Sequence, residues 1–270
     1  MTTAAELASY ASSFPSFRNR IINGNLSNPI NQRGAGSITA STGYTYDRWY
    51  YDGSTYLYQG IEDKNVNNGT YVISWEGAGI NAAWKVSTDT TAGNGPDATT
   101  GFTSVSNGGT FTVNEGTEYS KHLWIRFDGT LANLDKVMVE EGTVATPFEH
   151  RPISVELSLA QRYYQKSFPM DVAPAQNIGG NGALYCQGHA ANAPASGFVI
   201  FPTPMRNTPS IFTTYNPSAA NANWRNLATS TDITQVLYSS SSSGFFLYSN
   251  TQVLSQYEIA AIHWSAHAEL

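Results

Sequence analysis

The sequence predicts an all-β protein with two β-sandwich, jelly-roll-like domains in tandem and a short N-terminal helix. Apolar and polar residues alternate with a period of two, between turns rich in Gly, Asn and Asp, up to about residue 148 and again from residue 162. Pro152 separates the two halves, because proline removes a ladder donor and restricts the residue before it. The expected parts are an N-terminal segment 1–17, a domain 18–150, a linker 151–161 and a domain 162–270.

The N-terminal segment contains good helix formers. We expect a helix over residues 3–12, with Thr3 as its N-cap and Ala4 and Ala5 in its first turn. The segment carries too little apolar surface to fold alone, so we expect it to dock against a partner or against its own copies. A frayed terminus is the alternative.

In the first half, the alternation assigns residues to faces. Tyr71, Ile73 and Trp75 share one face of a strand, and Ala82, Trp84 and Val86 share one face of the next. Leu123, Ile125 and Phe127 lie opposite Trp124 and Arg126. We expect the aliphatic and aromatic sets to form the core and the opposite faces to be more exposed.

In the second half, Ser154 is expected to cap a short helix through residues 155–160. Ile262 and Trp264 share one face of the final strand, and His263 lies on the other. The strands expected here are residues 162–168, 183–189, 197–201, 210–215, 233–238, 244–248 and 256–265.

Composition limits the classes of partner. Charged residues make up 13% of the 270 residues, about half the usual ~25% share. The net charge is −6 and no run of Lys or Arg occurs, which argues against a nucleic-acid partner. No apolar run has the ~18–20 residues needed to span a membrane, and the N-terminus lacks the pattern of a signal peptide. We therefore expect synthesis in a cytoplasm, without membrane insertion.

No catalytic arrangement is evident, so we expect no enzymatic activity, no cofactor and no metal. No serine lies in a Gly-x-Ser-x-Gly turn, and no histidine spacing matches a metal site. Glu140 and Glu141 are adjacent and point to opposite faces of a strand, so they cannot form an acid/base pair. A spatial pair such as Asp47 with Glu76 would leave a glycan hydrolase as an alternative.

Aromatic and amide side chains are the better functional candidates. Sugar C–H faces stack on Trp and Tyr, and sugar hydroxyls pair with Asn and Arg. Burial in contacts between subunits is the alternative for each aromatic candidate, whereas Trp75, Trp84 and Trp264 are assigned to the core. The candidate glycan-binding residues are Trp124, Arg126, Tyr56 and Tyr58 in the first half and Tyr215, Asn216, Asn221, Asn223, Trp224 and Arg225 in the second.

Three segments together resemble bacteriophage tail-fibre and receptor-binding proteins. The first runs from Arg18 through Ile21-Ile22-Asn23-Gly24-Asn25 to Gly36, the second is Tyr44–Trp49, and the third is residues 137–168. In such proteins the first two segments open a carbohydrate-binding-module-like domain, and the third closes it and leads into a distal β-domain. The interval between Trp49 and Val137 is shorter than in the usual module, which implies a compact sandwich.

The resemblance implies a homotrimer in the virion tail, made in the host cytoplasm. Its N-terminal segment would contact a tail or baseplate protein, and its C-terminal domain would face the receptor. We therefore expect non-catalytic attachment to a host cell-surface polysaccharide, strengthened by threefold avidity. A purely structural tail, baseplate or head decoration protein is the alternative, and a glycan depolymerase is a further one.

Overall fold

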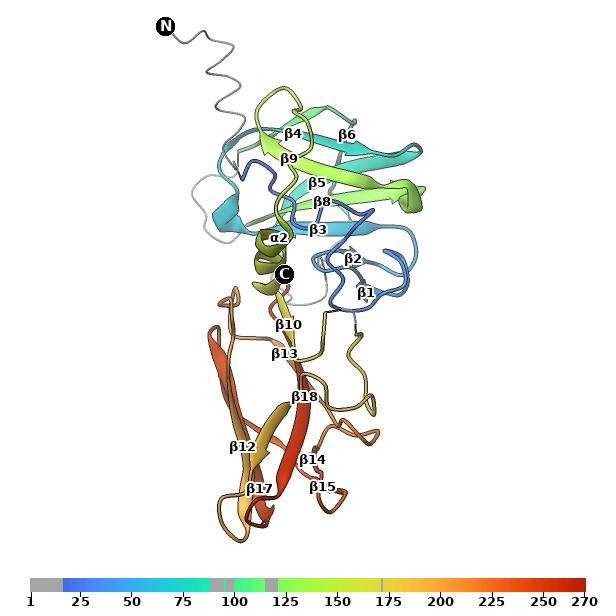
Figure 1. Cartoon of the computed structure of the whole chain (residues 1–270). Coiled ribbons are helices and arrows are strands. Elements are labelled where there is room, and N and C mark those ends of the chain that lie inside the picture. The colour runs from blue at the N-terminus through green and yellow to red at the C-terminus, as the bar shows by residue number, and fades with distance from the viewer. Residues whose placement is uncertain (1–16, 88–94, 96–99, 115–120, 171) are drawn as a thin grey trace, which may run out of the picture.

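The computed structural model describes residues 17–87, 95, 100–114, 121–170 and 172–270, and the regular structure among them is mainly strand. The all-β prediction is therefore confirmed at this level. The expected helix over residues 3–12 lies outside the described residues. Two lobes are stacked end to end (Figure 1): strands β1–β9 form the upper lobe and strands β10–β18 form the lower lobe.

The upper lobe contains two antiparallel sheets. A six-stranded sheet has the order β1-β2-β3-β8-β5-β6, and a three-stranded sheet has the order β7-β4-β9. Two 3-10 turns, η1 (Asp63–Asn65) and η2 (Leu131–Asn133), lie in the connections. The strands are β1 (Gly43–Tyr44), β2 (Tyr50–Tyr51), β3 (Leu57–Ile61), β4 (Gly69–Glu76), β5 (Ile80–Ser87), β6 (Thr103–Val105), β7 (Thr110–Val113), β8 (His122–Gly129) and β9 (Asp135–Glu141).

The inward faces of these strands form one hydrophobic cluster. Tyr71, Ile73 and Trp75 of β4 are buried in it, as the alternation predicted. Leu123, Ile125 and Phe127 of β8 belong to the same cluster, and Trp84 packs against it from β5. The predicted inward faces are therefore confirmed, because burial of a strand's apolar face fixes its register.

The lower lobe is organised around one long strand, β18 (Ile259–His267). Its first half pairs with β11 (Leu184–Gln187) and β14 (Trp224–Asn226), and its second half with β10 (Tyr164–Lys166) and β13 (Ile211–Tyr215). Both edges of β18 are thus paired. The remaining strands are β12 (Ala193–Ile200), β15 (Thr231–Ile233), β16 (Val236–Ser241) and β17 (Gly244–Leu254), and β12-β17-β16 form a separate three-stranded sheet.

A second hydrophobic cluster lies within the lower lobe. Ile262 and Trp264 of β18 belong to it, as predicted, together with Phe245 and Leu247 of β17. His263, on the opposite face of β18, is also buried and stacks on Phe168 with ring centroids 4.0 Å apart. The sequence placed His263 on the face opposite the core, and it did not show that a loop of the lower lobe covers this face.

The only α-helix among the described residues is α2 (Ile153–Gln161), in the connection between the lobes. The predicted cap was wrong by two residues: Pro152 occupies the N-cap position, and Ser154 lies within the first turn. Proline is well suited to a helix start, since the first turn needs no donor from it. Ser154 instead accepts a hydrogen bond from Ser158 Oγ through its carbonyl.

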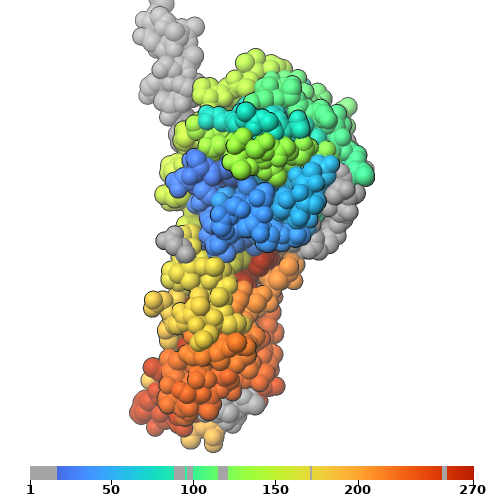
Figure 2. Space-filling view, turned by 90° about the vertical axis from the view of Figure 1, so that its right-hand side faces the viewer, coloured from blue at the N-terminus to red at the C-terminus, as the bar shows by residue number. Residues whose placement is uncertain are grey.

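The last residues of the chain lie where the two lobes meet, a region called the waist from here on (Figures 1 and 2). Leu270 is 1% exposed and packs against Trp124 and Tyr58 on the outer face of the six-stranded sheet. The hydroxyl of Tyr44 donates a hydrogen bond of 2.9 Å to the Leu270 carbonyl. Gly60 permits this approach, since a Cβ at that position would lie 2.7 Å from Leu270 Cδ1.

We predict that Leu270→Ala lowers the free energy of unfolding by about 2–5 kcal/mol, because it removes a fully buried side chain at the waist. Urea unfolding followed by tryptophan fluorescence measures this, since Trp124 gains access to water. Val144→Ala is the matched control: Val144 is 75% exposed, and we expect its effect to stay within about 0.5 kcal/mol. Equal stabilities of the two variants would show that Leu270 does not hold the lobes together.

Candidate binding site

The structure brings the four candidates of the first half onto one sheet face, but that face is covered. Trp124 and Tyr58 are 0% and 1% exposed. The Arg126 guanidinium lies over the Tyr56 ring at 4.2 Å and over the Phe102 ring at 4.7 Å. The inference that Trp124 and Tyr58 offer open stacking surfaces was therefore wrong, because residues of the same chain occupy that space.

The six candidates of the second half also lie near one another, around a residue that the sequence did not single out. Asp232 of β15 accepts hydrogen bonds from Asn216 Nδ2 at 2.9 Å and Asn221 Nδ2 at 2.7 Å. It also pairs with Arg225 at 2.9 Å. Partial burial alone would raise the pKa of Asp232, but the hydrogen bonds from these three residues hold it below the usual value. The amides and the guanidinium are therefore engaged by a carboxylate of the same chain.

The remaining candidates of this group also make contacts within the lower lobe. Trp224 is 0% exposed within the hydrophobic cluster of the lower lobe. The Tyr215 hydroxyl lies 3.1 Å from Ser265 Oγ, and the backbone amide of Asn223 donates to Asn221 Oδ1. These residues stabilise the loops of the lower lobe, and none of them offers an open aromatic platform.

A buried cluster of charges occupies the waist. Glu269 is fully buried and pairs with Arg48 and, at 2.9 Å, with Arg33. Arg33 Nε also lies 3.6 Å from the buried carboxylate of Asp47. Two cations therefore face two anions, which is the condition under which charges are tolerated in an interior.

Aromatic rings of the lower lobe complete this cluster. The Arg48 guanidinium lies 3.5 Å from the centroid of the Tyr163 ring, and that of Arg33 lies 3.9 Å from the centroid of the Tyr164 ring. Cation–π attraction strengthens when water is excluded. The two arginines belong to the upper lobe and the two tyrosines to the start of the lower lobe, so these contacts fix one lobe against the other.

Burial changes the proton affinity of two groups in the cluster. Desolvation raises the pKa of Asp47 to about 6, although Arg33 opposes the shift. Desolvation and the nearby Arg33 lower the pKa of His267 to about 3. His267 Nδ1 lies 3.3 Å from Arg33, so a proton on this ring would add a third cation to a balanced site.

Residues 18–36, 44–49 and 137–168, far apart in the sequence, meet beside the waist. Asn19 donates to the Val137 carbonyl at 3.0 Å and accepts from the Val139 amide at 3.1 Å. Asn23 donates to the carbonyls of Ile30 at 2.8 Å and Asp47 at 2.9 Å. These side chains satisfy backbone groups that have no strand partner, so their function in the fold is structural.

Arg151 connects the same segments to the linker. Its guanidinium donates to the carbonyls of Asn19 and Ile21 and pairs with Glu149 at 3.4 Å and Glu156 at 3.2 Å. Glu156 also accepts from the Asn23 backbone amide. Arg151 is therefore held by groups from the first segment, the linker and helix α2.

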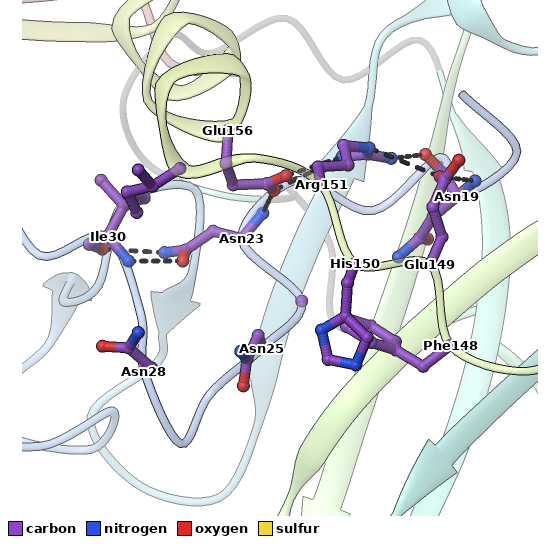
Figure 3. A pocket seen from close by; sticks show the side chains of 12 residues that line it. Asn19, Asn23, Asn25, Asn28, Ile30, Phe148, Glu149, His150, Arg151 and Glu156 are labelled. Atoms are coloured by element: carbon purple, nitrogen blue, oxygen red, sulfur yellow. Dashed lines mark hydrogen bonds and ion pairs between the residues drawn. The ribbon is translucent and has the colours of Figure 1, made fainter. Parts of the chain in front are cut away.

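A pocket of about 120 Å³ lies between the loop of residues 19–30 and the linker (Figure 3). The hydrogen-bonded groups around Arg151 and Asn23 form one side of it. Asn25, Asn28 and His150 lie along the other side, with Phe148 next to His150. The His150 and Phe148 rings meet edge to face, with centroids 4.9 Å apart. A concave shape with a few convergent polar groups makes this the candidate binding site.

The pocket combines fixed walls with free polar groups. Asn28 and His150 are exposed, and neither side chain hydrogen bonds to another described residue. Amide, imidazole and aromatic edges of this kind suit a neutral, hydroxyl-rich ligand. Sequence reasoning missed this site. The density of asparagines from Asn19 to Asn28 was the available signal, but the second wall comes from a distant segment.

The described part of the chain contains no cluster of three or more His, Cys, Asp or Glu side chains placed to hold a metal ion. None of its helices has the length and apolarity required to cross a bilayer.

We predict that stability falls as the pH drops below about 6.5, in part through His267. Its folded pKa of about 3 lies below the unfolded value of 6.5, so the unfolded chain binds the proton first and the contribution is lost on acidification. Asp47 acts in the opposite direction, because its folded pKa is raised. His267→Gln should make the loss of unfolding free energy between about pH 6.5 and about pH 4 shallower, by at most about 1.4 kcal/mol per pH unit. Urea unfolding at each pH measures this.

His189→Gln is the control, because His189 is exposed, and it should leave the slope unchanged. The lowered pKa values of His122 and His263, both caused first by burial, leave a residual slope in either variant. A wild-type slope in His267→Gln would contradict the assignment.

The site is thus a preformed polar pocket with an aromatic edge, next to a waist that is fixed by paired buried charges. It can hold a neutral ligand by hydrogen bonds and ring contacts. Its two carboxylates are both engaged with Arg151. No family model matches the chain, and the searches of curated proteins and of solved structures give no match either.

Proposed function

We propose that the protein is a non-catalytic attachment protein of a phage tail fibre or tail tip, which binds a neutral glycan on the host surface. The pocket between residues 19–30 and the linker is the observation that carries this proposal. It offers the Asn28 amide and the His150 imidazole beside the Phe148 ring, which is the combination that hydroxyl groups and sugar C–H faces require.

The state of the carboxylates supports binding rather than hydrolysis. A glycosidase needs one carboxyl group that carries a proton and a second one that is free to act as base or nucleophile. Glu149 and Glu156 line the pocket, but Arg151 pairs with both. Because each carboxylate is already engaged by the same guanidinium, neither is free to act as base or nucleophile.

The arrangement of the chain as two tandem β-sandwich domains is part of the same proposal. The two hydrophobic clusters, each enclosed by its own sheets, support tandem β-sandwich domains joined by the linker. In this arrangement the N-terminal segment docks on the tail or baseplate, and the lower lobe is distal. A homotrimer would present three pockets, and threefold avidity would convert weak single contacts into firm attachment.

A purely structural virion protein is the second candidate, and one observation favours it. Phe198 and Ile200 of the lower lobe are 62% and 72% exposed. Large exposed apolar side chains that lie close together mark protein contacts more often than sugar contacts. Excess free protein should inhibit infection of the host only if the chain binds the receptor, so competition separates the two candidates.

We predict that the double variant Asn28→Ala/His150→Ala binds neutral oligosaccharides at least about tenfold more weakly than the wild type, because two polar contacts are lost. An array of neutral hexose and N-acetylhexosamine oligosaccharides, followed by calorimetry on the best binder, measures this. Both residues are exposed, so the variant should unfold at the wild-type temperature.

Asn207→Ala/His189→Ala is the matched control, since both residues are exposed in the lower lobe, away from the pocket. It should bind as the wild type does. Failure of the wild-type protein to bind any oligosaccharide on the array, or to adsorb to host cells, would refute the proposed function. Equal affinities of the two double variants would refute the pocket as the site.

A further inference from the structure

The sheet β12-β17-β16 has an outer face of aromatic and aliphatic side chains. Its members, here called the apolar face, are Phe198, Ile200, Tyr238, Phe246 and Tyr248. Phe198 of β12 is paired in register with Phe246 of β17. The Tyr238 ring meets Phe246 and Tyr248 edge to face, with centroids 6.0 Å and 5.6 Å apart. The residues therefore form one contiguous surface.

The apolar face is open to solvent among the described residues. Ile200 and Tyr238 are each 72% exposed, and Phe198 is 62% exposed. The opposite face of the same sheet is the lower-lobe core, where Phe245 and Leu247 are 1% and 0% exposed. A strand that is apolar on both faces is typical of a sheet covered on both sides. The described chain covers only one.

The charge pattern indicates what covers the other side. No Asp, Glu, Lys or Arg occurs in residues 172–205 or 233–257, which include all three strands of the sheet, although the chain has a net charge of −6. A charged partner would bury its charges against this face without counter-ions, which is costly. The occupant must therefore be apolar and uncharged where it meets the face, and the face of a second copy meets both conditions.

We propose that the apolar face is the contact between copies of this chain. Two acidic chains can approach there without burying like charges, and closed symmetric assemblies form when such a face packs against its own copies around a rotation axis. The pocket is lined by residues of the upper lobe, the linker and α2, so a contact through the apolar face does not use its lining residues. This inference does not depend on the glycan proposal, because it concerns another surface.

The test compares the mass in solution of the full chain with that of a face variant. Sedimentation velocity and light scattering should give the wild type a multiple of 29.3 kDa at micromolar concentration. Ile200→Ser/Tyr238→Ser should weaken association at least about 100-fold, since two apolar side chains are removed from the contact. Val144→Ser/Tyr257→Ser is the matched control, with exposed fractions of 75% and 71% outside the face, and should associate as the wild type does.

A pair of charge variants identifies the partner as a second copy. Tyr238→Lys and Tyr238→Glu should each be single chains, whereas their mixture should associate again, because opposite charges then meet across the contact. Circular dichroism and thermal unfolding confirm that each variant is folded. This pair keeps the proposal testable if the serine variant does not fold.

Three outcomes would overturn the proposal. The wild type would sediment as a single chain, or the serine variant would associate as strongly as the wild type. Alternatively, neutral oligosaccharides would bind the wild type and not the serine variant while both remain single chains, which would make the face a glycan platform. Loss of array binding in the pocket variant with unchanged mass leaves this inference intact, so the two proposals fail separately.

Discussion

The buried carboxylate of Glu269 is the interaction on which the arrangement of the lobes depends. It lies between Arg48 and Arg33, both of the upper lobe, while its own backbone continues the central strand of the lower lobe. Removal of one partner from a buried ion pair costs about 3–5 kcal/mol, because the remaining charge is left unpaired. The same contact brings Leu270 over Trp124, which closes the outer face of the six-stranded sheet. The position of one carboxylate therefore decides which aromatic residues can reach solvent.

The polar side chains of residues 18–36, 44–49 and 137–168 are used within the fold. Asn19, Asn23 and Arg151 satisfy carbonyl and amide groups of three separate segments. Each of these hydrogen bonds either joins two stretches that lie far apart in the sequence or closes an irregular loop. A loop without strand partners must satisfy its backbone with side chains, because an unpaired buried amide or carbonyl is costly. A pattern of asparagines and arginines in such a segment is thus explained by architecture. Asn28, a neighbour that the network does not require, is therefore available for the proposed ligand contact.

The sequence predicted those features of the fold that depend on residues close together in the chain, such as the inward face of a strand. Alternation assigned the inward faces of β4 and β8 correctly, because burial of one face depends only on residues two apart. Alternation also placed Trp124 on the outer face, but it could not show that Leu270 covers that face from the other end of the chain. Asp232 was missed for the same reason: it organises Asn216 and Arg225 through the fold, from a strand too short to predict. The helix cap at Ser154 failed because Pro152 supplied an equally good start two residues earlier.

The distribution of charge separates two kinds of contact in this molecule. Charges are concentrated at the waist, where Arg33, Arg48, Asp47 and Glu269 balance one another and are removed from solvent. The sheet β12-β17-β16 contains none, so its contacts rest on apolar area alone and are only weakly sensitive to salt and pH. Acid can therefore loosen the waist, through groups such as His267, under conditions in which an association through the apolar face persists. In an assembly held by the lower lobes, each upper lobe with its pocket would then gain freedom relative to the others, and the avidity of attachment would become a property of the waist rather than of the pocket itself.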